Sequence, residues 1–169
     1  MIKIYTDGSS RKDNEGGWAF VVSNESKIIY ADYEQLEKVT NNNMELLAII
    51  KACIYADKFF KNKPVIIYSD SAYCVNIVNE WMYNWSNNNW QRPHNHEIKN
   101  LEFVKYLYNL FSQDFYHCEV QKVAGHSEIF ENELADALAS NNIIKFNKLI
   151  NNSEYEIKKE VKELMNDNK

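Results

Sequence analysis

The chain has few cysteines, no long apolar run and no surplus of basic residues. Its three cysteines, Cys53, Cys74 and Cys118, are odd in number and widely spaced within apolar stretches. This pattern suits small buried thiols better than disulfides or a thiolate metal site. No apolar stretch approaches the roughly 18 residues of a membrane span. The first residues also lack the basic and apolar segments of a secretory signal. We therefore expect a cytoplasmic protein that does not contact membranes.

The charge balance gives no general indication of nucleic-acid binding. The chain carries 24 acidic and 19 basic residues, for a formal net charge of −5. Phosphate affinity normally depends on clustered Lys and Arg, so any role on nucleic acid requires local chemistry that outweighs this average. Its 169 residues, 45% of them hydrophobic, are enough for one domain with a real core.

The hydrophobic pattern predicts an α/β domain with the element order βββαβαβα. Strands are expected over residues 2–6, 17–23, 27–33, 65–69 and 116–123, and helices over about 40–60, 71–81, 98–111 and 131–139. The segment 81–97, rich in Asn, Trp and His, reads as an irregular excursion. Beyond residue 141, weak helical spacing is consistent with either a loosely attached helix or a frayed tail.

Four acidic residues stand out by their place in these elements. Asp7 and Asp70 are expected near the carboxyl ends of strands, where ligands gather in α/β sheets. Glu45 and Asp136 are expected on helices that could reach the same point. Each acid alone has a simpler explanation: a turn at Asp7, helix-dipole support at Glu45, a helix cap at Asp70, or a solvated position at Asp136.

Four carboxylates at one point would repel one another, so such a cluster requires bound cations or raised pKa values. Ligands that are all oxygen suit Mg²⁺, with Mn²⁺ as a substitute, whereas zinc favours Cys or His. Two such ions can clamp the attacking and leaving oxygens of a phosphodiester. A two-ion magnesium site is therefore one interpretation of the four acids, and it is favoured over four unrelated caps and turns because the residues flanking all four match a known pattern in the same order.

These frames resemble the type 1 ribonuclease H family over about residues 1–140. The resemblance is carried by Tyr-Thr-Asp-Gly-Ser at 5–9, Thr-Asn-Asn-Asn-Met-Glu-Leu at 40–46, Ser-Asp-Ser at 69–71, Trp-Met-Tyr-Asn-Trp at 81–85, and Gly-His-Ser at 125–127 followed by Asn-Glu-Leu-Ala-Asp at 132–136. It implies a five-stranded mixed sheet of order 3-2-1-4-5 with helices on both faces. Residues 1–141 would form the catalytic domain and 142–169 a C-terminal extension, helical or partly disordered.

The resemblance also implies endonucleolytic cleavage of the RNA strand of RNA–DNA hybrids, leaving a 3′-hydroxyl and a 5′-phosphate. Asp7 would bridge both ions, Asp136 would complete the ion that activates water, and Glu45 with Asp70 would hold the other. His126, with an unperturbed pKa of about 6.5, could carry a proton or assist product departure. The partner would be an RNA–DNA hybrid, bound by a monomer.

Further family positions imply contacts with the hybrid. Short amide side chains are expected to form hydrogen bonds with the 2′-hydroxyl groups of the RNA strand in the minor groove. The expected substrate-binding residues are Asn14, Thr40, Asn41, Asn42, Trp81, Asn84 and Trp85. Thr40 and Asn84 would hold a phosphate of the DNA strand, and the tryptophans would pack against its sugar. As alternatives, Asn41 and Asn42 could simply cap a helix and the tryptophans could simply pack.

The chain departs from the family where basic residues are common. Many members carry a lysine-rich protrusion after the tryptophan segment, but residues 86–92 offer only Arg92. At three further positions, the residues that are frequent in the family are Gln, Lys and Gly, and this chain has Ala72, Ala124 and Glu128, respectively. No separate hybrid-binding domain is expected before Met1. These departures predict weaker phosphate binding at physiological salt.

Two other functions compete with this assignment. One is a nucleic-acid-binding module that keeps the fold but has weak catalysis, and the other is a related nuclease that acts on DNA. The presence of all four acids argues against the first, and the Asn-rich frames that favour a mixed duplex argue against the second.

Overall fold

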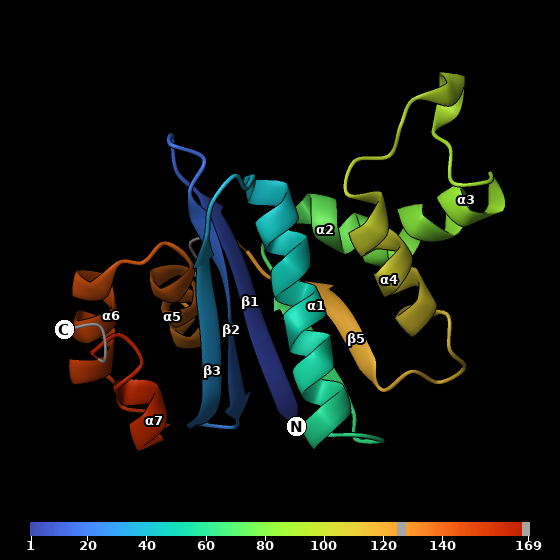
Figure 1. The fold of residues 1–169 in the computed structure, drawn as a ribbon. Coiled ribbons are helices and arrows are strands. Elements are labelled where there is room, and N and C mark those ends of the chain that lie inside the picture. The colour runs from blue at the N-terminus through green and yellow to red at the C-terminus, as the bar shows by residue number, and fades with distance from the viewer. Residues whose placement is uncertain (125–127, 167–169) are drawn as a thin grey trace.

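A six-stranded mixed sheet runs through the centre of the computed structural model, which describes residues 1–124 and 128–166 (Figure 1). The strands are β1 (Ile2–Ser10), β2 (Gly16–Asn24), β3 (Lys27–Leu36), β4 (Val65–Ser69), β5 (Cys118–Lys122) and β6 (Glu156–Ile157). Their order is β5-β4-β1-β2-β3-β6, with β1, β2 and β3 antiparallel and the other neighbours parallel. The predicted order 3-2-1-4-5 is confirmed, and β6 adds a sixth strand at the edge.

Helices cover both faces of the sheet (Figure 1). They are α1 (Asn41–Phe59), α2 (Ala72–Asn76), the π-helical turn η1 (Ile77–Trp81), α3 (Met82–Asn87), the 3₁₀ turn η2 (Pro93–Asn95), α4 (Leu101–Phe111), α5 (Phe130–Ala139), α6 (Ile143–Asn151) and α7 (Lys159–Lys162). Among the described residues, no helix combines the length and apolarity needed to cross a membrane.

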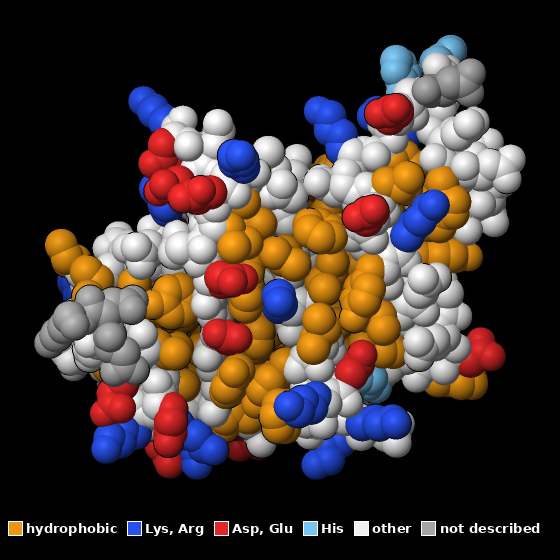
Figure 2. Space-filling view, in the orientation of Figure 1, with side chains coloured by type: hydrophobic (Ala, Val, Ile, Leu, Met, Phe, Trp, Pro, Cys, Tyr) orange, Lys and Arg blue, Asp and Glu red, His pale blue; other side chains and the backbone are white. Residues whose placement is uncertain are grey.

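Strand β2 shows why the sheet needs a helical layer on each side. Trp18, Phe20 and Val22 belong to the core shared with α1, while Ala19 and Val21 belong to the core shared with α5. Side chains alternate between the two faces of a strand, so a strand with apolar side chains on both faces must be covered by a helical layer on each face. On the α1 side, apolar side chains also reach the surface, as Figure 2 shows.

The helix expected over residues 71–81 runs on to Asn87. Its course passes through the π-helical turn η1 and continues as α3, so the first part of the expected excursion is helical. Ile77, Val78 and Met82 are buried in the core, and this packing holds a stretch whose Asn-rich composition favours irregular structure.

The C-terminal segment packs on the second face and edge of the sheet. Phe146 of α6, Ile157 of β6 and Val161 of α7 are buried together with residues of α5. The backbone N–H of Lys158 donates to the carbonyl of Ile28 over 3.1 Å, which ties this segment to β3. Residues 143–166 therefore belong to the packed molecule.

Candidate active site

The register of the sheet brings Asp7 and Asp70 to the same level. The last parallel pair between β1 and β4 joins Tyr5 to Tyr68, so the two aspartates stand two residues beyond it on neighbouring chains. The Thr6 hydroxyl donates to the Tyr68 carbonyl over 2.8 Å and fixes this alignment. The Asp7 side chain is buried, and Asp70 is half-buried directly after β4.

Glu45 reaches the same point from the first turns of α1. A capping box starts this helix: the Thr40 hydroxyl accepts from the Asn43 N–H, and the Asn43 side chain accepts from the Thr40 N–H. Glu45 therefore faces the sheet, where its carboxylate is buried. The backbone N–H of Gly8 lies 2.7 Å from Glu45 Oε1 and 2.9 Å from Asp7 Oδ1.

Gly8 is required by the close approach of β1 to α1. A Cβ atom at this position would overlap the backbone of Met44 and Glu45. The absence of a side chain lets one N–H group approach two carboxylates and orient both of them. The Ser69 hydroxyl adds a longer contact of 3.4 Å to the other oxygen of Glu45.

The structure brings three of the four predicted acids together. One carboxylate oxygen from each of Asp7, Glu45 and Asp70 lies within 4.8 Å of the others. Burial, followed by the charge and hydrogen bond of Glu45, raises the pKa of Asp7 well above its ordinary range. Burial also raises the pKa of Glu45 to about 7, and Asp70 adds to this shift. Such a cluster favours either protons or a cation.

The fourth acid, Asp136 on α5, is engaged by a lysine. Lys145 Nζ on α6 lies 2.6 Å from Asp136 Oδ2 and 2.6 Å from Glu133 Oε2. The charge of Asp136 contributes to the raised pKa of Asp7, which places it in the same electrostatic environment. The ion pair with Lys145 nevertheless sets Asp136 apart from the other three acids. His126 lies outside the described residues.

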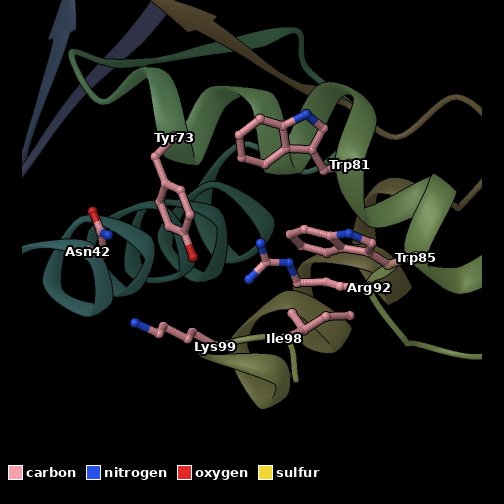
Figure 3. A pocket seen from close by; sticks show the side chains of 7 residues that line it. All are labelled: Asn42, Tyr73, Trp81, Trp85, Arg92, Ile98 and Lys99. Atoms are coloured by element: carbon pink, nitrogen blue, oxygen red, sulfur yellow. The ribbon is translucent and has the colours of Figure 1, made fainter. Parts of the chain in front are cut away.

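A groove of about 500 Å³ lies between the start of α1, the α2–η1–α3 helical stretch and the segment before α4 (Figure 3). Its lining residues are Asn42, Tyr73, Trp81, Trp85, Arg92, Ile98 and Lys99. Trp81 and Trp85 stand one helical turn apart with ring centroids 6.0 Å apart. Aromatic faces beside two cations are a typical combination for nucleic-acid strands.

Three of the other predicted substrate residues, Asn14, Asn41 and Asn84, lie on the β1–β2 loop, at the start of α1 and on α3. The Asn41 side-chain oxygen accepts from the Ser10 N–H over 2.6 Å and from its hydroxyl over 3.0 Å. Asn14 is exposed in the β1–β2 loop with a φ of 62°, and its carbonyl accepts from the Val39 N–H. Asn84 is exposed on α3, one turn before the end of that helix.

Sequence reasoning missed several residues at this site. Tyr73 and Ile98 line the groove, but a tyrosine on a helix and an isoleucine before one carry no functional signal by themselves. Lys145 was missed because it lies in the C-terminal segment, to which no chemistry was assigned. The lysine spacing from Asp136 is not a motif, and only the packing of α6 on α5 brings the two together.

Comparison with known proteins identifies the family. The model of the RNase H family matches residues 1–144. The chain belongs to the ribonuclease H family. A ribonuclease H of Orientia tsutsugamushi (strain Boryong) is 34% identical over 90% of this chain and 88% of its own length. A ribonuclease H of Acetivibrio thermocellus is 36% identical over 87% of this chain and 97% of its own.

A solved structure is similar to this chain in its fold. The foamy viral protease-reverse transcriptase in complex with an RNA/DNA hybrid matches 82% of this chain with a TM-score of 0.69 and 25% identity. The match spans 19% of that longer chain. The ribonuclease H family assignment makes this chain a nuclease, and its acidic cluster could bind metal ions.

Proposed function

We propose that this chain is an endonuclease that cleaves the RNA strand of RNA–DNA hybrids with two divalent ions, leaving a 3′-hydroxyl and a 5′-phosphate. The observation that carries the proposal is the convergence of Asp7, Glu45 and Asp70 within 4.8 Å at the end of the parallel strands. The relatives named above are ribonucleases H, and one solved neighbour binds an RNA/DNA hybrid.

The donor set fits hard cations. The three clustered ligands are carboxylates, and none of the described groups around them adds a thiolate or an imidazole to the cluster. We assign Glu45 and Asp70 to one ion, Asp7 to both, and Asp136 to the second. Mg²⁺ is the expected ion and Mn²⁺ a substitute. When bound, such ions stabilise the attacking and leaving oxygens of a phosphodiester.

The chain's own groups orient these ligands. The Gly8 N–H donates to both Asp7 and Glu45, and this shared donor fixes the angle between the two carboxylates. Ser69 holds the second oxygen of Glu45. We infer that His126 carries a proton near neutral pH, as its unperturbed pKa of about 6.5 allows.

The predicted substrate-binding residues suit the two strands of a hybrid. The Asn41 oxygen is held by Ser10, which orients its amide NH₂ group as a donor for a 2′-hydroxyl. The Thr40 hydroxyl accepts from Asn43 and can donate its own proton to a phosphate. We assign Asn14 and Asn42 to the minor groove, Asn84 to the DNA phosphate, and Trp81 and Trp85 to a sugar of that strand.

The test uses three end-labelled duplexes of one sequence: an RNA–DNA hybrid, an RNA duplex and a DNA duplex. Each is incubated with Mg²⁺, Mn²⁺ or a chelator. We expect cleavage of the RNA strand of the hybrid alone, in either metal, and no cleavage in the chelator. Cleavage of the DNA duplex, or cleavage that persists in the chelator, would contradict the proposal.

One observation favours a second candidate, a hybrid-binding module with weak catalysis. The ammonium of Lys145 occupies an oxygen of Asp136, the acid assigned to the second ion. Hybrid binding in a gel-shift assay without measurable cleavage at saturating Mg²⁺ would support this candidate. A monomeric state and a cytoplasmic location stay predictions, which size-exclusion chromatography and cell fractionation would test.

A further inference from the structure

A second group of metal-ligating side chains lies away from the acidic cluster. It comprises Asp57 near the end of α1, His117 just before β5, and Cys118 at the first position of β5, each with one ligand atom within 4.8 Å of the others. The parallel strands β4 and β5 begin at the same end of the sheet. Cys118 is the first residue of β5, whereas Asp70 follows the last residue of β4, so the two lie at opposite ends of these strands. The two groups of ligands are therefore independent.

The separations in this group are close to those of a tetrahedral zinc site. Cys118 Sγ lies 3.7 Å from His117 Nε2. Zinc–sulfur and zinc–nitrogen bonds of about 2.3 and 2.0 Å place tetrahedral S and N ligands roughly 3.5 Å apart. Asp57 Oδ1 lies 2.5 Å from the same nitrogen, so it would retreat by less than about 1 Å to share an ion.

The imidazole of His117 is already oriented as a ligand. Its Nδ1 lies 3.1 Å from the Lys63 carbonyl, to which it can donate, and this leaves Nε2 directed at Asp57. A histidine that binds metal through one nitrogen generally donates from the other to a carbonyl or carboxylate, which fixes its tautomer. The Lys63 carbonyl supplies that partner.

The third ligand is a thiol in a suitable environment. Cys118 is buried beside Cys53, which stands one helical turn before Asp57 on α1. Zinc binds a cysteine as the thiolate, so binding here would displace the proton of the Cys118 thiol.

The group is accessible from solvent. Asp57 and His117 line a surface pocket of about 740 Å³, and their side chains are 36% and 12% exposed. Water from this pocket can reach a fourth coordination position. The two soft or borderline ligands, Cys118 and His117, distinguish this group from the acidic cluster, where every ligand is a carboxylate oxygen.

We propose that Asp57, His117 and Cys118 form a zinc site, with water as the fourth ligand. The ion would join the end of α1 to the start of β5. Without zinc, Asp57 and His117 satisfy each other as an ion pair, and the Tyr116 hydroxyl donates to the same Asp57 oxygen over 2.7 Å. The proposal is independent of the nuclease activity.

The test is a calorimetric titration of Zn²⁺ into the full chain in excess Mg²⁺, which keeps the hard carboxylate ligands occupied. We expect one equivalent of zinc to bind, with at least tenfold weaker binding to Cys118→Ser and to His117→Gln. Co²⁺ in place of zinc should give a thiolate-to-cobalt charge-transfer band in the wild type and in Cys74→Ala, which alters a buried cysteine outside the group, but not in Cys118→Ser.

Two further measurements keep the result unambiguous. Asp70→Asn should bind zinc like the wild type, because it changes only the acidic cluster. If Cys118→Ser does not fold, His117→Gln decides the outcome, and zinc should raise the melting temperature of the wild type but not of this variant. Zinc binding that is equal in wild type and His117→Gln, or that is lost in Asp70→Asn, would overturn the proposal.

Discussion

The ammonium group of Lys145 lies 2.6 Å from a carboxylate oxygen of Asp136, although the two residues come from different helices. Partial burial alone would lower the pKa of Lys145. The pKa is nevertheless raised, because Asp136 and Glu133 accept hydrogen bonds from the ammonium group. A cation held here competes with any divalent ion that uses Asp136. Lys145 lies one residue beyond the segment that the family model matches, so this competition is a property of the C-terminal segment.

Replacing Lys145 with Met should tighten the binding of Mg²⁺ and Mn²⁺. Partly exposed ion pairs contribute up to about 1 kcal/mol, which corresponds to roughly a fivefold change in affinity. Isothermal titration calorimetry would measure it. Lys148→Met is the matched control, since Lys148 is an exposed lysine of the same helix. Equal metal affinity in the two variants would show that Lys145 does not compete with the metal.

Replacing Asp7 with Asn should reduce hybrid cleavage by about 10²–10³-fold or more, because it removes a charge assigned to both ions. The metal-free protein should not lose stability, since the change relieves repulsion with Glu45 and Asp70. Single-turnover cleavage and urea unfolding in chelator measure the two effects. Asp114→Asn, at an exposed position far along the chain, is the control. Mg²⁺-dependent cleavage at the wild-type rate would defeat the metal assignment.

The stability of the metal-free protein should fall as the pH rises from about 4.5 to about 7. Glu45 ionises near 4.5 when unfolded but near 7 when folded, so the folded state binds more protons within this window. The free energy of unfolding therefore decreases as Glu45 ionises, by an amount on the order of 3 kcal/mol. Urea unfolding in chelator at several pH values measures the slope. Asp7 and His117 contribute slopes of the same sign, because their pKa values are also raised in the folded state. The relevant quantity is therefore the difference between the wild type and Glu45→Gln. An identical slope in this variant would refute the prediction.

Replacing Gly8 with Ala should destabilise the fold by about 1–3 kcal/mol or more, because the added methyl group overlaps backbone atoms of Met44 and Glu45. Backbone cannot move aside as a flexible side chain can, so we also expect the loss of hybrid cleavage. Urea unfolding measures the cost. Ser9→Ala, one residue further along β1, should change stability by about 0.5 kcal/mol or less. A Gly8→Ala variant as stable as Ser9→Ala would contradict the close approach.

Replacing Arg92 with Gln should raise the KM for a hybrid with a smaller effect on kcat. The residue lines the groove beside Trp85, and loss of one phosphate contact should also reduce the slope of log KM against log salt by about 1. Steady-state kinetics between low and physiological salt measure both quantities. Lys58→Gln, a charge change on the exposed end of α1, should leave the salt slope unchanged. A wild-type salt slope in Arg92→Gln would remove this residue from the hybrid interface.

Local signals in the chain were sufficient for the main elements, and the resemblance of its sequence frames to a known family identified the residues of the acidic cluster. Alternating and continuous apolar runs identify β1, β2 and β4, because a strand buried on one or both faces must carry that pattern. The short sequence frames around Asp7, Glu45 and Asp70 can also be recognised in the sequence. The carboxyl ends of parallel strands in an α/β sheet lie together at one end of the sheet. The proximity of these acids therefore followed from the order of the elements.

Tertiary structure alone decided which charges meet across the chain. The pairing of Lys145 with Asp136 depends on how α6 packs on α5, and the contact of Asp57 with His117 depends on where α1 ends relative to β5. Neither pair has a characteristic spacing, because contacts between separate elements are fixed by the packing of apolar faces. The sequence determined which residues could act as ligands, whereas the packing of the helices determined which partner each of them has.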